Sequence, residues 1–205
     1  MKTTIISLII AAFLWFLMFS PLTSSLFNFW VLMSFSGIIL ILLSLFFNKG
    51  FYNNIHFNLK AVVYGILSAI ILWFIFWIGN EISSLIFSFT SKQVNLIYDI
   101  KTGSNPVFLI FLLVFIIAPA EEIFWRGFIQ NKFSERWNSN VGFILTTFFY
   151  AIIHIFSLNF ILIMAALVAG IFWGLMYKYN SKNLLPLIIS HSVWDVLVFI
   201  IFPIY

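Results

Sequence analysis

The chain has no cysteine, and only 8% of its 205 residues are charged. Without cysteine there are no disulfide bonds, no thiolate metal ligands and no cysteine nucleophile. The scarcity of charge excludes a water-soluble globular domain, because such domains are about 25% charged and cover their surface with polar residues. The net charge is +4, but no basic patch contains interleaved aromatic residues, so nucleic acid is not an expected partner.

Hydrophobic residues make up 63% of the chain and fall into long runs. Because a membrane-spanning helix needs about 20 apolar residues, these runs predict a multi-pass protein of the cell membrane, in contact with the lipid bilayer. The expected fold class is all-α, a polytopic transmembrane helical bundle of about seven to eight spans. The spans predicted with most support are residues 4–20, 26–47, 61–79, 106–128, 141–157, 160–177 and 184–204.

Basic residues are distributed unevenly between the two ends of these spans. Lysine and arginine are enriched in cytoplasmic loops, and a cytoplasmic N-terminus places seven basic residues inside and two outside. We therefore expect a cytoplasmic N-terminus and an external C-terminus. Residues 81–100 mix apolar and polar side chains, and they could form an interfacial helix, a re-entrant piece or an eighth crossing. The inner basic residues are Lys2, Lys49, Lys60, Lys132, Arg136, Lys178 and Lys182, and the outer ones are Lys92 and Lys101.

Two adjacent carboxylates, Glu121 and Glu122, follow an apolar run over residues 107–118. A charge inside a membrane-spanning helix costs roughly 2.5–3.5 kcal/mol on insertion scales, so it marks a functional site by default. Glu122 and Arg126 are four residues apart and share a helix face, which predicts a structural ion pair. Glu121 lies about 100° around the helix and is left free for chemistry.

Further ionisable residues lie within later spans: His154 in the fifth, and His191 with Asp195 one helical turn apart in the seventh. Such costly groups become tolerable when they converge on a shared polar cavity. A carboxylate and an imidazole can activate a water molecule there, or nitrogen and oxygen ligands can hold a divalent metal such as zinc. The residues themselves leave both alternatives open. Neither the HExxH motif nor the Gly-x-Ser-x-Gly motif is present.

The first three predicted spans contain no acid, base or histidine in their interior. We therefore expect a single membrane domain over residues 1–205, in which residues 1–105 form N-terminal scaffold spans and residues 106–204 form the catalytic core. The chemistry falls in three motifs of that core, which are Glu121-Glu122-x3-Arg126, Tyr150-x3-His154 and His191-x3-Asp195.

The order and spacing of these motifs resemble those of the CAAX protease and bacteriocin-processing family, the Abi group of intramembrane proteases. The resemblance covers about residues 106–200, and its combination of three motifs is specific. The second motif of that family usually has phenylalanine where this chain has Tyr150, which adds a hydroxyl. The third ends in asparagine or aspartate, and this chain has Asp195.

The resemblance implies an intramembrane endopeptidase that cleaves a hydrophobic peptide or a membrane-anchored protein, in peptide maturation or bacteriocin self-immunity. It implies that Glu121 and His154 activate water, and that His191 and Asp195 stabilise the oxyanion or complete the site. An ionised Asp195 can only accept hydrogen bonds, so we expect it to orient His191. The family allows a glutamate and histidine mechanism or a metal held by Glu121, His154 and His191.

Two other functions remain open at this stage: a non-catalytic membrane scaffold that retains the fold, and an ion-coupled transporter. The transporter is disfavoured because the first three spans supply no charged partner for a relay. Counting about 1.5 Å per residue places Glu121 and His191 near the cytoplasmic third of the bilayer and His154 nearer the outside. We therefore predict that the hairpin at residues 157–159 is sunk into the protein and that the site opens toward the cytoplasm.

Overall fold

The computed structural model describes residues 1–48 and 54–205, and in these ranges seven apolar helical segments are candidates for membrane crossings. Six helical segments of this part are long and apolar enough to cross a membrane, and a seventh is shorter. Every regular element in the described ranges is helical, which confirms the predicted fold class and a multi-pass membrane protein. Lys49, used in the orientation prediction, lies outside the described residues. The crossing segments are Lys2–Phe19 (α1), Phe29–Phe47 (α2), Leu59–Ile86 (α3), Pro106–Arg136 (α5 to α7), Ser139–Ser157 (α8 and η5), Phe160–Tyr179 (α9) and Leu185–Ile201 (α10 and η6).

The fourth crossing is longer than its hydropathy predicted. It was expected over residues 106–128, but the helix continues to Arg136 and has 31 residues. Polar residues beyond Phe128 ended the apolar pattern without ending the helix. The crossing consists of Pro106–Leu112 (α5), Leu113–Ile117 (η3), Ala118–Glu122 (α6), Ile123–Gln130 (η4) and Asn131–Arg136 (α7).

Two wide helical segments of π type, η3 and η4, flank the short helix that carries the carboxylate pair. Pro119 lies in the first turn of this short helix, and it lacks a backbone N–H to donate to the preceding turn. Widened π turns of this kind occur mostly as local insertions within α-helices, frequently at functional sites. The backbone is therefore irregular on both sides of Glu121 and Glu122.

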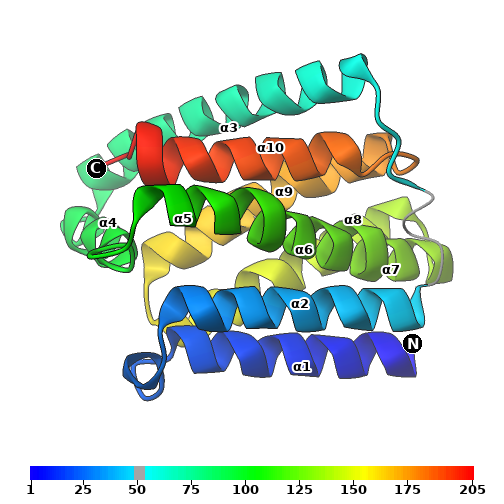
Figure 1. The fold of residues 1–205 in the computed structure, drawn as a ribbon, viewed down its shortest axis with the longest axis horizontal. Coiled ribbons are helices and arrows are strands. Elements are labelled where there is room, and N and C mark those ends of the chain that lie inside the picture. Colours follow the sequence, from blue (N-terminus) through cyan, green and yellow to red (C-terminus); the bar gives the residue numbers. More distant parts are fainter. Residues whose placement is uncertain (49–53) are drawn as a thin grey trace.

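Residues 81–100 do not form an eighth crossing. Helix α3 extends to Ile86, and the next helix, Thr90–Asp99 (α4), has ten residues. Ten residues rise about 15 Å, which is half the thickness of the hydrocarbon core. Figure 1 shows α4 at the end of the bundle that also carries the C-terminus. Of the three possibilities left open by the sequence, the length of α4 and its place at the end of the bundle favour the interfacial helix.

The two termini lie at opposite ends of the bundle, as an odd number of crossings requires (Figure 1). The N-terminal end also carries the end of α2 and the start of α10, whereas the end of α1 and the start of α9 lie at the other end. Large apolar side chains, phenylalanine and isoleucine among them, are exposed on most outer helix faces. Because lipid tails solvate such side chains, this surface is the expected one for a bundle in a bilayer.

Helix α3 packs closely against α10 through Gly65. A Cβ atom added at Gly65 would lie 2.8 Å from the Ile189 Cβ atom and 2.9 Å from the Pro186 carbonyl oxygen. Small residues at helix contacts in membranes let two backbones approach in this way. Gly65 therefore fixes the position of α10, which carries His191 and Asp195.

We expect Gly65→Ala to lower the free energy of unfolding by about 1–3 kcal/mol, because the new methyl group overpacks the contact with α10. Gly79→Ala is the matched control, since an added Cβ at Gly79 has nothing within 4 Å. Thermal unfolding in detergent measures both variants. Equal melting temperatures for the two variants would contradict the close contact.

Candidate active site

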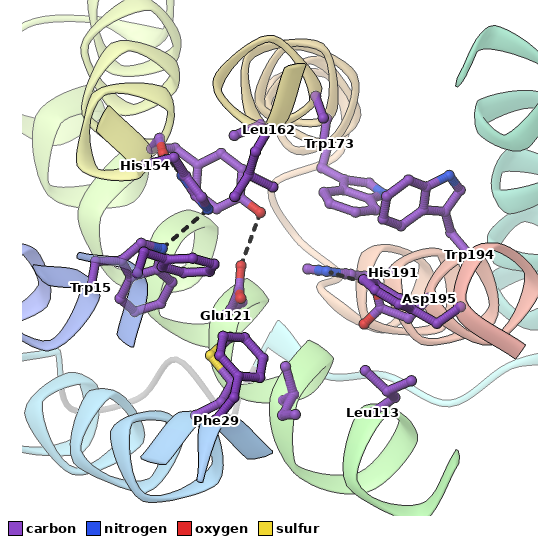
Figure 2. A pocket seen from close by; sticks show the side chains of 18 of the residues that line it. Trp15, Phe29, Leu113, Glu121, His154, Leu162, Trp173, His191, Trp194 and Asp195 are labelled. Atoms are coloured by element: carbon purple, nitrogen blue, oxygen red, sulfur yellow. Dashed lines mark hydrogen bonds and ion pairs between the residues drawn. The ribbon is translucent and has the colours of Figure 1, made fainter. Parts of the chain in front are cut away.

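A cavity of about 140 Å³ lies inside the bundle and is lined by side chains from α1, α2, the fourth crossing, α8 with η5, α9 and α10. Glu121, Tyr150, His154, His191 and Asp195 all line it. Figure 2 shows Glu121 between His154 on one side and His191 on the other. Most of the remaining lining is aromatic or aliphatic. The bundle thus brings the predicted polar residues of three separate crossings to one cavity.

Glu121 receives one hydrogen bond from the fifth crossing: the Tyr150 hydroxyl donates to its Oε2 atom at 2.9 Å. Helix α6 positions the carboxylate, which is 6% exposed. Within the described residues, no hydrogen bond reaches the Oε1 atom, and Glu121 borders the cavity. One carboxylate oxygen is therefore fixed by tyrosine, and the other is available to a molecule in the cavity.

Glu122 does not line that cavity, and its carboxylate contacts the Arg126 guanidinium and the His191 imidazole. Its Oε1 atom accepts from Arg126 Nη1 at 2.8 Å and from His191 Nδ1 at 2.8 Å. Glu122 is fully buried, and Arg126 is 1% exposed. The four-residue spacing predicted the contact with Arg126, but the contact with His191 was not predicted.

Aromatic rings enclose the Arg126 guanidinium on two sides. Its Cζ atom lies 4.7 Å from the centre of the Tyr150 ring and 5.5 Å from that of Trp173. A cation over an aromatic face is attracted by about 0.5–2 kcal/mol, more when water is excluded. The arginine therefore connects the fourth crossing to α8 and α9 as well as neutralising Glu122.

His191 is oriented by Glu122 and not by Asp195, which corrects the sequence-based expectation. The distance from His191 Nε2 to Asp195 Oδ1 is 3.7 Å, longer than a hydrogen bond, although the two residues share a helix face. Trp173 stacks on the imidazole with ring centres 3.9 Å apart, and its Nε1 donates to Ser190 Oγ at 3.1 Å. Stacking and the bond to Glu122 together fix the ring plane.

Both nitrogens of His154 are occupied. His154 Nδ1 lies 2.8 Å from the Tyr150 carbonyl oxygen, and His154 Nε2 lies 3.1 Å from Trp15 Nε1. The carbonyl can only accept and the indole can only donate, so Nδ1 carries the proton and Nε2 presents its lone pair. Figure 2 shows Trp15 reaching this nitrogen from α1. The first crossing thus takes part in the site, although its sequence contains no charged residue beyond Lys2.

The donor set does not fit a metal ion. Among residues 1–48 and 54–205, no group of three histidine, aspartate or glutamate side chains converges to hold one. His154 Nε2 faces an indole N–H, so the ligating position of this imidazole already has a partner. The proposed ligand set Glu121, His154 and His191 is therefore not assembled as a metal site, and no step is derived through a metal.

The cavity lies in the half of the bundle opposite the N-terminus. This differs from the sequence-based expectation, which combined a cytoplasmic N-terminus with a site that opens toward the cytoplasm. Its lining includes Phe19 at the end of α1, Phe29 at the start of α2 and Phe199 near the C-terminus. The fourth crossing is 31 residues long, so Glu121 lies at its middle, whereas the expected bounds placed it near the inner end.

The hairpin between the fifth and sixth crossings is covered by α4. Asn159 Nδ2 donates to the Gln93 carbonyl at 2.9 Å, and Gln93 Oε1 accepts from the Ile161 backbone at 3.0 Å. Asn159 is 6% exposed, whereas Leu158, at φ 51°, is exposed. Part of the hairpin is buried in protein, where irregular backbone is tolerated at membrane depth.

Sequence reasoning missed two residues of this arrangement, Trp15 and the Tyr150 hydroxyl as a partner of Glu121. Tyr150 offered a signal, because it stands where the similar family usually has phenylalanine. Trp15 offered none, since its contact with His154 spans 139 positions of the chain. No periodicity or spacing rule reaches that far.

The fold and the cavity define a class: a polytopic helical membrane protein with a buried site of carboxylates and imidazoles. Residues 103–197 match the family model described as Type II CAAX prenyl endopeptidase Rce1-like. The matched region contains all three motifs, and the match bears out the resemblance of this region to the family. No curated protein and no solved structure shows significant similarity to the chain.

Proposed function

We propose that the protein is an intramembrane endopeptidase that hydrolyses peptide bonds of hydrophobic, membrane-associated substrates. The observation that carries this proposal is the shared cavity, in which an available carboxylate, Glu121, lies among His154, His191 and Asp195. The Rce1-like match supports the same activity. Roles in peptide maturation or bacteriocin self-immunity are specific forms of this function that the resemblance suggests.

Hydrolysis needs a base for water, a place for the scissile carbonyl and a donor for the oxyanion. In this proposal Glu121 Oε1 takes a proton from water, and the resulting hydroxide attacks the carbonyl carbon. His154 Nε2 accepts a hydrogen bond from the same water after the Trp15 Nε1–H group has moved away from that nitrogen. His191 and Asp195 face the other side of the carbonyl, where His191, with both ring nitrogens protonated, donates its Nε2–H to the developing oxyanion. The proton on Glu121 then passes to the leaving amine as the carbon–nitrogen bond breaks.

The proposal also assigns different roles to the two parts of the chain. Residues 106–204 supply the reacting groups, and residues 1–105 mainly supply the scaffold. Helices α1 and α2 nevertheless line the cavity through Trp15, Phe29 and other apolar side chains. The scaffold therefore also forms one wall of the substrate site.

The test of function is hydrolysis of internally quenched apolar peptides by the purified protein in lipid vesicles. We expect His154→Ala to lower kcat by about 100-fold or more, because the water loses one of its two acceptors. His56→Ala is the matched control, since His56 lies in the loop before α3 and does not line the cavity. Unchanged cleavage by His154→Ala would remove His154 from the mechanism, whereas no cleavage by the unmodified protein would leave the non-catalytic scaffold as the better function.

Tyr150→Phe tests the hydroxyl that binds Glu121. This variant removes one donor at 2.9 Å and retains the ring that faces Arg126. We expect kcat to fall about tenfold with KM unchanged, since a hydrogen bond to a charged group contributes about 1.5–3 kcal/mol and part of it is regained from water. Steady-state kinetics on the same peptides separates the two constants. A change in KM alone would indicate that Tyr150 binds substrate and does not position Glu121.

A further inference from the structure

The cavity reaches one end of the bundle. Four apolar side chains form its rim, and each belongs to a helix terminus at the end that carries the C-terminus: Phe19 closes α1, Phe29 opens α2, Leu162 is in the first turn of α9, and Phe199 is in η6. The Phe19 and Phe29 ring centres are 5.4 Å apart. From this rim the cavity extends inward to Glu121 at the middle of the fourth crossing.

Charge separates the two ends of the bundle. In the described ranges, six basic residues and one acid, Glu135, lie at the N-terminal end, whereas the rim end carries two basic and two acidic residues. The rule that cytoplasmic segments are rich in lysine and arginine therefore places the N-terminal end in the cytoplasm. The basic residues of that end are Lys2, Lys60, Lys132, Arg136, Lys178 and Lys182, and the rim end carries Glu81, Lys92, Asp99 and Lys101.

From these two observations we infer that the site opens to the extracytoplasmic face and takes an apolar peptide segment presented from that side. The inference rests on the proposed function and specifies its substrate class. A substrate that is already across the membrane, or anchored in its outer leaflet, reaches Glu121 past the aromatic rim without crossing the bundle.

The chemistry of the wall favours an extended apolar segment. On α9, Ala165, Ala166 and Ala169 form a surface of small side chains opposite the aromatic residues of α1 and α2. Burial of apolar side chains between these surfaces contributes roughly 25 cal/mol per Å² removed from water. The charged residues of the lining are Glu121 and Asp195, and the four rim side chains are all apolar. The rim therefore favours large apolar side chains of the substrate, and the polar groups of the cavity are left to act on its peptide bond.

The absence of cysteine makes a direct test available, because a single introduced thiol is the only one in the chain. Ser24→Cys lies in the exposed turn between α1 and α2 at the rim end, and Ser181→Cys lies in the exposed turn between α9 and α10 at the other end. In intact cells, a membrane-impermeant maleimide should remove the free thiol of Ser24→Cys completely. The thiol of Ser181→Cys should be lost only after permeabilisation. The reverse pattern would overturn the inference.

Ala165→Cys tests the cavity itself, because Ala165 lines it and is half-buried. A small, charged methanethiosulfonate reagent added outside intact cells should modify this thiol. A soluble peptide with a central run of leucine and phenylalanine and lysines at its ends should slow that modification. The same peptide with serine and asparagine in the run should not. Modification that requires permeabilisation, or none at all in the folded protein, would contradict the external opening.

Thiol labelling does not depend on catalysis, so the two proposals fail separately. External labelling of Ala165→Cys without any peptide cleavage by the unmodified protein would reject the endopeptidase and retain the opening. Cleavage by the unmodified protein with labelling of Ala165→Cys only from the cytoplasm would retain the endopeptidase and reject the opening. The labelling can also be repeated in a chain that carries Glu121→Gln.

Discussion

Glu121→Gln is expected to lower kcat for peptide hydrolysis by about 10²–10⁴-fold, the range attributed to a positioned general base. The amide preserves the size of the side chain, and its oxygen can still accept the Tyr150 hydroxyl that now donates at 2.9 Å. What it removes is the charge and the basicity of the oxygen that faces the cavity. The loss should therefore appear in kcat, with substrate binding and the fold retained.

Glu135→Gln is the matched control for that prediction. It makes the same chemical change on α7, where Glu135 pairs with Lys132 at 2.9 Å and its side chain is 55% exposed. Exposed pairs contribute at most about 1 kcal/mol, so this variant should retain activity and stability. Kinetics in vesicles, together with melting temperatures in detergent, compares the two. Equal activities would remove Glu121 from the role of base.

The parts of this site that the sequence predicts are those set by short spacings. Glu122 and Arg126 are one turn apart on one helix, so their contact follows from helix geometry alone. Convergence of Glu121, His154 and His191 follows less directly, from the cost of leaving each of them alone in lipid. Both arguments need only the identity of the residues and the helices that carry them.

The remaining features depend on contacts between residues far apart in the chain, and no spacing rule predicts such contacts from the sequence. His191 selects Glu122 over Asp195 because the fourth crossing passes close to its Nδ1 atom, not because of any spacing on α10. The length of the fourth crossing was mispredicted for a related reason. Hydropathy ends at Phe128, whereas the helix continues to Arg136.

Arg126→Met should be the most destabilising of the substitutions considered, by about 3–5 kcal/mol, because it leaves the fully buried Glu122 without its cation. Methionine fills a similar volume between the Tyr150 and Trp173 rings, so lost packing contributes little. Two atoms of the pair, Glu122 Oε2 and Arg126 Nε, already have no hydrogen-bond partner among the described residues. Arg136→Met on α7 is the matched control and should change stability by less than about 1 kcal/mol.

The double variant Glu122→Gln with Arg126→Met separates the effect of the unpaired charge on Glu122 from the effect of the lost guanidinium contacts. Glutamine is neutral and can still accept from His191 Nδ1, which Glu122 Oε1 now contacts at 2.8 Å. Removal of the unpaired charge should therefore restore most of the stability lost in Arg126→Met, and the coupling free energy of the cycle should be about 2–3 kcal/mol. Unfolding in mixed micelles measures all three variants and the unmodified protein. If Arg126→Met and the double variant are equally unstable, the guanidinium acts through its contacts with the aromatic rings, and the ion pair is not what holds the fourth crossing in place.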